Sequence, residues 1–218
     1  MTAAQLSRYI LCLLLVLCCA VPAAAAGKQK KEYAFVPDPE ADGAAMLSGS
    51  TWVGLGSGFT LRLQRVDETQ RQAYIEKVTG VATDPFATPP DQEPRFLSFL
   101  MQLENNGAGS LVFRSAQCWL VTNKAEHLNP VGMDTLRASY AVMEAEISPA
   151  YERVGSAFLP TDRTLHPGES MAGLLVYNMV KTGTRRYKVD IQITTASGDV
   201  VPVTAPYRRV KLERSDEP

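Results

Sequence analysis

Histidines are the side chains best suited to acid–base chemistry near neutral pH, and this 218-residue sequence has two. His127 lies in the stretch AEHLNP, and His166 directly precedes Pro167. A histidine-dependent hydrolase also needs a nucleophile, commonly the serine of a G-x-S-x-G turn, and the sequence has no such motif. We therefore interpret both histidines as solvated loop residues and predict that the protein is not an enzyme.

Paired carboxylates are a second source of chemistry, as acid and base in glycosidases or as calcium ligands. Glu144 and Glu146 flank one residue of a predicted helix, so their side chains point away from each other. Asp38, Glu40 and Asp42 form an acidic run, but no glutamate follows at the spacing of a calcium loop. We predict solvated carboxylates, with no catalytic residue and no metal site.

Copper binding through soft ligands is the most specific chemical alternative. The candidate ligands are Met101, Met133, Met143, Met171, Met179, Cys118, His127 and His166. They form no M-x-M or H-x-M cluster, and Cys118 lies in the apolar stretch AQCWLV, which is typical of a small buried residue. We expect core positions for Cys118, Met101, Met143, Met171 and Met179 and no cofactor. A periplasmic small-ligand or metal (copper) carrier stays open as the alternative function.

The N-terminal segment predicts export. Arg8 is its only charged residue, an apolar run follows over residues 10–21, and a run of alanines precedes Gly27. This order is typical of a cleavable secretory signal, which we place at residues 1–26. The apolar run is shorter than the ~20 residues that cross a bilayer, so we expect no transmembrane span after cleavage.

A lipid anchor is the weaker alternative for this segment. A lipoprotein signal places a small residue before its cysteine, whereas Leu17 precedes Cys18 and Cys18 precedes Cys19. Cleavage after residue 26 would leave Cys118 as the one cysteine, so no disulfide could form within the chain. We therefore expect a periplasmic or extracellular protein that is held together by its core.

Charge argues against some partners. Removing Arg8 from the 22 basic residues leaves 21 against 23 acidic ones, a net charge near −2. A nucleic-acid or anionic-lipid binding surface usually requires an excess of basic residues. We therefore predict no nucleic-acid partner.

Alternation of apolar and polar residues predicts a mainly β domain over residues 51–212. The predicted strands are residues 58–64, 96–104, 110–122, 171–180, 186–194 and 200–203. We expect 96–104 and 110–122 to pair as a hairpin, and 171–180 to be a central strand because both of its faces are apolar. Pro202 predicts an edge strand. The pattern predicts an immunoglobulin-like antiparallel β-sandwich with one or two short inserted helices.

Two helices are predicted from different signals. Asp67 and Gln70 form a capping-box pattern, and Gly80 ends the helix that begins there. A stripe of apolar residues with helical spacing predicts a second helix over residues 133–147.

The remaining segments are predicted to be irregular. Residues 27–50 are charged and rich in Ala, Gly and Pro, so we expect a flexible leader. Residues 81–95 contain four prolines and form a predicted loop, and residues 213–218 form a polar tail.

Three stretches carry a resemblance to a known class: FTLRLQRVDETQRQAYIEKV, FLSFLMQLENNGAGSLVF and LHPGESMAGLLVY. Together they resemble the exported immunoglobulin-like (telokin-like) β-sandwich domains of bacterial lipoproteins and secreted proteins of unknown function. The resemblance implies structural roles for the turn Pro167–Glu169 and for Gly173. It also implies a non-enzymatic protein, because the shared segments are architectural.

These observations predict an exported, non-catalytic protein that acts through protein or cell-envelope contacts. Trp52 and Phe86 are the aromatic residues that we expect on the surface. Residues 200–203 and the loop 81–95 are the expected docking sites for a protein partner in the cell envelope.

Overall fold

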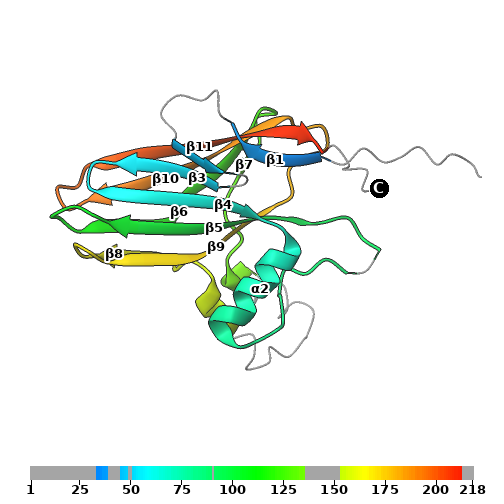
Figure 1. The fold of residues 1–218 in the computed structure, drawn as a ribbon, viewed down its shortest axis with the longest axis horizontal. Helices are drawn as coiled ribbons and strands as arrows, with labels where there is room; N and C mark the ends of the chain where they lie inside the picture. Colours follow the sequence, from blue (N-terminus) through cyan, green and yellow to red (C-terminus); the bar gives the residue numbers. More distant parts are fainter. Residues whose placement is uncertain (1–32, 39–44, 49–50, 90, 136–152, 213–218) are drawn as a thin grey trace, which may run out of the picture. The chain divides into compact units, whose positions relative to one another are not determined.

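The computed structural model describes residues 33–38, 45–48, 51–89, 91–135 and 153–212. Its strands form two antiparallel sheets packed together, which confirms the predicted mainly β sandwich (Figure 1). Sheet A has the order β1-β11-β10-β6-β7, and β8 also pairs with β6. Its strands are β1 (Tyr33–Pro37), β6 (Leu111–Thr122), β7 (His127–Leu128), β8 (Asp162–Leu165), β10 (Arg186–Thr195) and β11 (Val200–Lys211).

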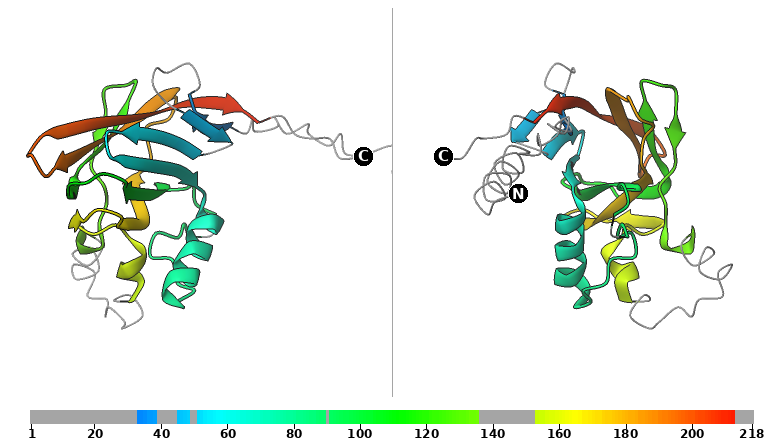
Figure 2. Two further views of the ribbon diagram at one scale, coloured as in Figure 1. Left: turned by 60° about the vertical axis from the view of Figure 1, so that its left-hand side comes forward. Right: turned by 90° about the vertical axis from the view of Figure 1, so that its right-hand side faces the viewer.

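Sheet B has the order β2-β3-β4-β5-β9. Its strands are β2 (Ala45–Ser48), β3 (Thr51–Gly56), β4 (Phe59–Val66), β5 (Phe96–Asn105) and β9 (Ser170–Asn178). Figure 2 shows the two sheets as separate layers when the molecule is turned.

The main hydrophobic core lies between the sheets, because every second side chain of a strand points to the same face. Phe99 of β5 and Tyr207 of β11 meet there with ring centroids 5.3 Å apart. The Tyr207 hydroxyl donates a hydrogen bond of 3.0 Å to the carbonyl oxygen of Leu63, in the opposite sheet. The alternation predicted for residues 186–194 is confirmed, since Tyr187, Val189, Ile191 and Ile193 are all buried in this core.

Helix α2 (Glu68–Thr79) begins and ends where the sequence predicts. The Gln70 N–H donates to Asp67 Oδ1 over 2.8 Å, and the Asp67 N–H donates to Gln70 Oε1 over 3.0 Å, which completes the capping box. Gly80 ends the helix at φ 69°, a conformation that costs glycine little.

A second hydrophobic cluster covers the outer face of sheet B at one end. Ile75 of α2, Phe86 of the loop after it, and Ala157 of the short 3₁₀ helix η1 (Gly155–Ala157) are all fully buried there. They pack with Leu174 and Val176 of β9. Sheet B is therefore covered on both faces at this end, where α2 and η1 lie (Figures 1 and 2).

A buried ion pair anchors this layer. Arg71 of α2 and Asp84 have side chains only 3% and 2% exposed. The Arg71 guanidinium donates through Nε to Asp84 Oδ2 (2.8 Å), through Nη1 to Ser98 Oγ (2.9 Å) and through Nη2 to the Phe86 carbonyl oxygen (2.7 Å). The Phe86 N–H in turn donates to Asp84 Oδ1 over 2.9 Å. One side chain thus joins α2, the loop after it and β5.

Part of the predicted flexible leader is ordered. Residues 33–37 form β1 and residues 45–48 form β2, although both lie within the predicted leader 27–50. The Asp38 N–H donates to the Pro206 carbonyl oxygen over 2.9 Å. β1 pairs with β11, which is far away in the chain, whereas β2 pairs with the next strand, β3. The composition of residues 27–50 reveals neither pairing.

The predicted hairpin is wrong, although both of its strands exist. β5 lies in sheet B and β6 lies in sheet A, so the turn after Asn105 carries the chain across the sandwich. The buried Asn105 amide stabilises this crossing by donating to the carbonyl oxygens of Gly109 (2.8 Å) and Leu165 (3.0 Å). Its side-chain oxygen accepts from the Gly107 N–H over 3.0 Å.

Two predicted strand positions also change. β9 is the last strand of sheet B and not a central one, because α2 and η1, rather than further strands, bury its second face. Residues 200–203 belong to the 12-residue strand β11, which lies between β10 and β1 in sheet A.

Several predicted segments lie outside the described residues. These are the signal at 1–26, the tail at 213–218, and residues 136–147 of the predicted second helix.

Replacing Arg71 with Met, or Asp84 with Asn, is expected to lower the free energy of unfolding by about 3–5 kcal/mol, because either change leaves a buried charge unpaired. The double variant Arg71→Met/Asp84→Leu should recover most of this loss. Urea unfolding followed by tryptophan fluorescence measures the effect.

The control is the exposed pair Arg62–Glu104, whose charged atoms lie 3.6 Å apart. Arg62→Met should cost less than about 1 kcal/mol. Equal losses for Arg71→Met and Arg62→Met would contradict the assigned role of the buried pair.

Candidate functional site

The candidate copper ligands that the structure describes are divided between the main core and more exposed positions. Cys118 and Met101 are fully buried, and Met171 is buried with them in the main core, as expected. Met179 is 38% exposed, just beyond the end of β9, so its predicted core position is wrong. Met143 lies outside the described residues. Within the described ranges, no three His, Cys, Asp or Glu side chains are placed to hold a metal ion.

Among the described residues, neither histidine belongs to a cluster that could hold a metal ion. His166 is exposed in the turn before β9, and its Nδ1 lies 3.3 Å from Ser110 Oγ. His127 is exposed on the two-residue strand β7, a short strand where a loop was expected. Both are solvent-exposed, as the sequence predicts.

The predicted surface aromatics are buried. Trp52 is 2% exposed and packs in the main core, while Phe86 is fully buried in the second cluster. Phe86 lies in a proline-rich loop, but burying its ring contributes about 1.5–3 kcal/mol, and the Arg71 network satisfies its backbone groups. Neither residue forms a partner surface.

Asp38 was predicted to be a solvated carboxylate, but it is largely buried. Its carboxylate is only 10% exposed and lies 3.7 Å from Arg186 Nε and 3.9 Å from Arg208 Nε. The other acidic residues considered, Glu40, Asp42, Glu144 and Glu146, lie outside the described residues.

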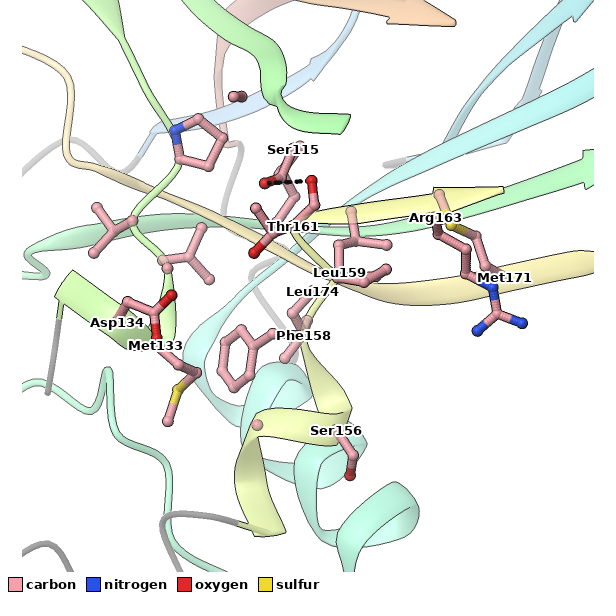
Figure 3. Close-up of a pocket in the computed structure, with 18 of the residues that line it drawn as sticks. Ser115, Met133, Asp134, Ser156, Phe158, Leu159, Thr161, Arg163, Met171 and Leu174 are labelled. Carbon is pink, nitrogen blue, oxygen red and sulfur yellow. Dashed lines mark hydrogen bonds between the residues drawn. The ribbon is translucent and has the colours of Figure 1, made fainter. Parts of the chain in front are cut away.

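A cleft of about 940 Å³ opens beside β9 (Figure 3). Segment 129–135, which follows β7, and segment 155–163, which leads into β8, form much of its lining. Residues 170–172 and 174–176 of β9 contribute, as do Ser115 and Ala116 of β6. The cleft thus lies where the chain passes from one sheet to the other.

Part of the lining comes from a bulge in β6. Ile193 of β10 pairs with Phe113 and Ile191 pairs with Cys118, so residues 114–117 lie opposite the single residue Gln192. The Ser115 N–H donates to the Thr161 carbonyl oxygen over 3.0 Å. The polar run RSAQ within an apolar strand is the sequence signal that could have revealed this bulge.

The edge of β9 is partly unpaired in this cleft. Backbone groups of an antiparallel strand alternate between facing the neighbour and facing away from it. The Leu174 and Val176 carbonyl oxygens face away from β5, accepting from Leu159 N–H (3.1 Å) and Val131 N–H (2.7 Å). Ala172 lies two residues before Leu174, so its N–H and C=O also point away from β5. Ala172 is exposed, and these two groups have no partner in the described part of the chain.

Gly173 and the turn before β9 have the structural roles that the resemblance implies. A Cβ on Gly173 would lie 2.8 Å from the Leu159 backbone nitrogen, so glycine allows segment 158–159 to approach β9. Gly168 has φ 80°, and its N–H donates to the Asn105 carbonyl oxygen over 2.9 Å.

The residues that line the cleft are suited to binding a ligand rather than to catalysis. Phe158, Leu159 and Met133 are partly exposed and supply apolar surface to the lining (Figure 3). Phe158 also forms an isolated β-bridge with the buried Leu174. Arg163 and Asp134 are the charged side chains among the described lining residues, which include neither histidine nor cysteine. The cleft therefore offers backbone hydrogen bonds and apolar contacts.

Neither a protein-family model nor a curated protein matches the sequence. Solved structures similar to this chain include the yjhA protein from Bacillus subtilis, at 13% identity over 64% of this chain and 76% of that chain, with a TM-score of 0.36. The ycdA protein from Bacillus subtilis subsp. subtilis str. 168 is 17% identical over 74% of this chain but 39% of that chain, with a TM-score of 0.39. A functionally unknown protein from Listeria monocytogenes EGD-e is 12% identical over 82% of this chain and 88% of that chain, with a TM-score of 0.40. No function follows from these similarities, and the immunoglobulin-like (telokin-like) subclass stays a prediction.

Burial governs the ionisable groups of the main core. It raises the pKa of the Cys118 thiol from 9.0 to about 12. It also raises the pKa of the Tyr177, Tyr187 and Tyr207 hydroxyls above their ordinary value of 10.0. These groups stay protonated in the folded protein at a pH where the unfolded chain ionises.

We expect stability to fall at alkaline pH. The contribution of Cys118 is fully present below pH 9 and is lost as the pH rises toward about 12, because the unfolded state then binds fewer protons. Urea unfolding across this range measures the loss. Cys118→Ala should reduce the loss without abolishing it, since the tyrosines remain.

The same burial predicts that iodoacetamide modifies Cys118 slowly in the folded protein and rapidly in urea. Equal alkylation rates in the two states would contradict the assignment of Cys118 to the core.

Proposed function

We propose that this chain is an exported, non-catalytic β-sandwich protein that binds an extended segment of a partner protein at the cleft beside β9. The observation that carries the proposal is the exposed backbone edge at Ala172, which lines the cleft and makes no hydrogen bond to β5. An unpaired strand edge can accept a further strand through main-chain hydrogen bonds.

The surroundings of Ala172 fit such a partner. The Leu159 and Val131 N–H groups already donate to the same edge of β9. Their acceptors are the carbonyl oxygens of Leu174 and Val176, two and four residues after Ala172. A partner strand at Ala172 would extend this row of hydrogen bonds. Side chains of the partner would contact Phe158 and Leu159, which are partly exposed, while Arg163 favours an acidic residue in it.

Export is supported by the sequence of residues 1–26. In the part of the chain that the structure describes, no helix has the length and apolarity of a membrane span. A partner in the periplasm or cell envelope is consistent with both observations.

The variant Ala172→Pro tests the proposal, because proline removes the Ala172 N–H, which faces away from β5, and leaves the β5–β9 pairing in place. We would select peptides from a random display library on the full chain and measure their affinities by fluorescence polarisation. Ala172→Pro should weaken binding about tenfold, the effect of one lost hydrogen bond and a steric clash.

Ala172→Ser is the matched control, since it keeps the N–H and should bind as the unchanged protein does. Unfolding midpoints establish that both variants fold. Selected peptides that bind Ala172→Pro with undiminished affinity, or a selection that yields none, would refute the proposed site.

A further inference from the structure

Arg163 lies on the inner face of sheet A, the face that forms the main core. It is directly opposite Phe113, and residues opposite each other on neighbouring strands carry their side chains on the same side of a sheet. Phe113 is fully buried in the main core, as is Leu165, which has the same side of β8 as Arg163. The Arg163 side chain is nevertheless exposed, because β8 is an edge strand and the cleft opens beside it.

The acidic neighbour of Arg163 is paired on the other side of the strand. Asp162 precedes Arg163 in the chain, so its side chain lies on the opposite face of β8, where its Oδ2 is 3.2 Å from Arg114 Nε. The Arg163 guanidinium makes no ion pair or hydrogen bond with the described part of the chain. Asp134, the other charged side chain of the described lining, is on the opposite side of Phe158 (Figure 3). One side of the cleft thus offers a cation.

Arg163 is at the level of the open edge of β9. β8 ends at Leu165 and β9 begins at Ser170, so Arg163 and Ala172 are each two residues from the turn that joins the two strands. At about 3.3 Å per residue, both lie roughly 7 Å along their strands from that turn. Both line the cleft, as does Met171. A segment bound at Ala172 would therefore pass close to Arg163.

The alternation of β9 decides which residue of a bound segment faces Arg163. Met171 packs in the main core between the sheets, whereas Leu174 packs in the second cluster on the outer face of sheet B. Ala172 lies on the same side of β9 as Leu174, so a partner residue directly opposite Ala172 would point to the outer face. The next partner residue, opposite Met171, would point to the inner side, where Arg163 lies.

Given a partner strand at the edge of β9, as the proposed function has it, we propose that Arg163 selects segments with an acidic residue opposite Met171. A carboxylate at this position can accept two parallel hydrogen bonds from the guanidinium. The partner residue opposite Ala172 lies on the side of Phe158, which packs against the second cluster, so an apolar side chain is favoured there. The partner class is an extended segment in which an acidic residue is next to an apolar one.

Parallel selections from the random display library test this preference, with the unchanged chain and the variant Arg163→Glu as targets. Peptides selected on the unchanged chain should share Asp or Glu at one position. Peptides selected on Arg163→Glu should share Lys or Arg at that position. The substituted position is exposed, so the variant should fold, and its unfolding midpoint establishes this.

Fluorescence polarisation then measures the charge pairing itself. Replacing the shared acidic residue of a selected peptide with Lys should weaken binding to the unchanged chain at least about fivefold, the effect of a lost ion pair at an accessible site. The Lys-containing peptide should regain most of that affinity on Arg163→Glu. Added salt should reduce the difference between the two peptides, because it screens exposed charges.

The matched control is Lys77→Glu, which makes the same change in net charge at an exposed position of α2, outside the cleft lining. It should bind both peptides as the unchanged chain does. A loss of acidic preference in Lys77→Glu equal to that in Arg163→Glu would show that net charge, and not Arg163, sets the preference.

Two further results would overturn the role of Arg163: selected peptides that share no acidic position, or a Lys-containing peptide that binds Arg163→Glu no better than it binds the unchanged chain. If the same peptides still lose affinity on Ala172→Pro, the binding edge of β9 stands and only the preference is wrong. A selection that yields no peptide would refute the edge and the preference together.

Discussion

The buried pair of Arg71 and Asp84 holds in place the layer that covers the outer face of sheet B. Removing two charges from water costs several kcal/mol for each ion, so such a pair persists only where its hydrogen bonds are satisfied. Arg71 donates to Asp84, Ser98 and the Phe86 carbonyl, and Asp84 accepts from the Phe86 N–H as well. The network therefore fixes α2 and its following loop on β5, which allows Phe86 to be buried.

The layer of α2 and η1 on sheet B also determines where the cleft lies. Ala157 is buried beside Ile75, and this packing holds segment 158–159 against the edge of β9. The chain then leaves sheet B, and Thr161 accepts a hydrogen bond from Ser115 in sheet A. Among the described residues, none donates to or accepts from the outward-facing backbone groups of Ala172, beyond this point on β9. The candidate binding edge thus lies where segment 158–161 passes from the edge of β9 in sheet B to β6 in sheet A.

The net charge of the sequence does not show where its charged residues lie in the fold. The sequence has nearly equal numbers of acidic and basic residues, and this total does not show which of them lie side by side. Pairing β10 with β11 places Arg186 opposite Arg208, and the Asp38 carboxylate lies 3.7 Å from Arg186 Nε and 3.9 Å from Arg208 Nε. The electrostatic energy depends on this local arrangement, because salt screens interactions between exposed charges beyond about 8–10 Å.

The sequence by itself determined the local features of this protein: the alternating strand at Arg186–Thr195, the capping box of Asp67 and Gln70, the turn at Gly168 and the burial of Cys118. Each depends on neighbours within a few residues, so a pattern in the sequence is sufficient. Only the tertiary structure decided that β5 and β6 lie in different sheets, that β9 is an edge strand, and that Arg71, Trp52 and Phe86 are buried. The candidate site belongs to this second group. It is made by segments far apart in the chain, and their contacts are chosen by the burial of apolar surface and the pairing of buried polar groups across the whole fold.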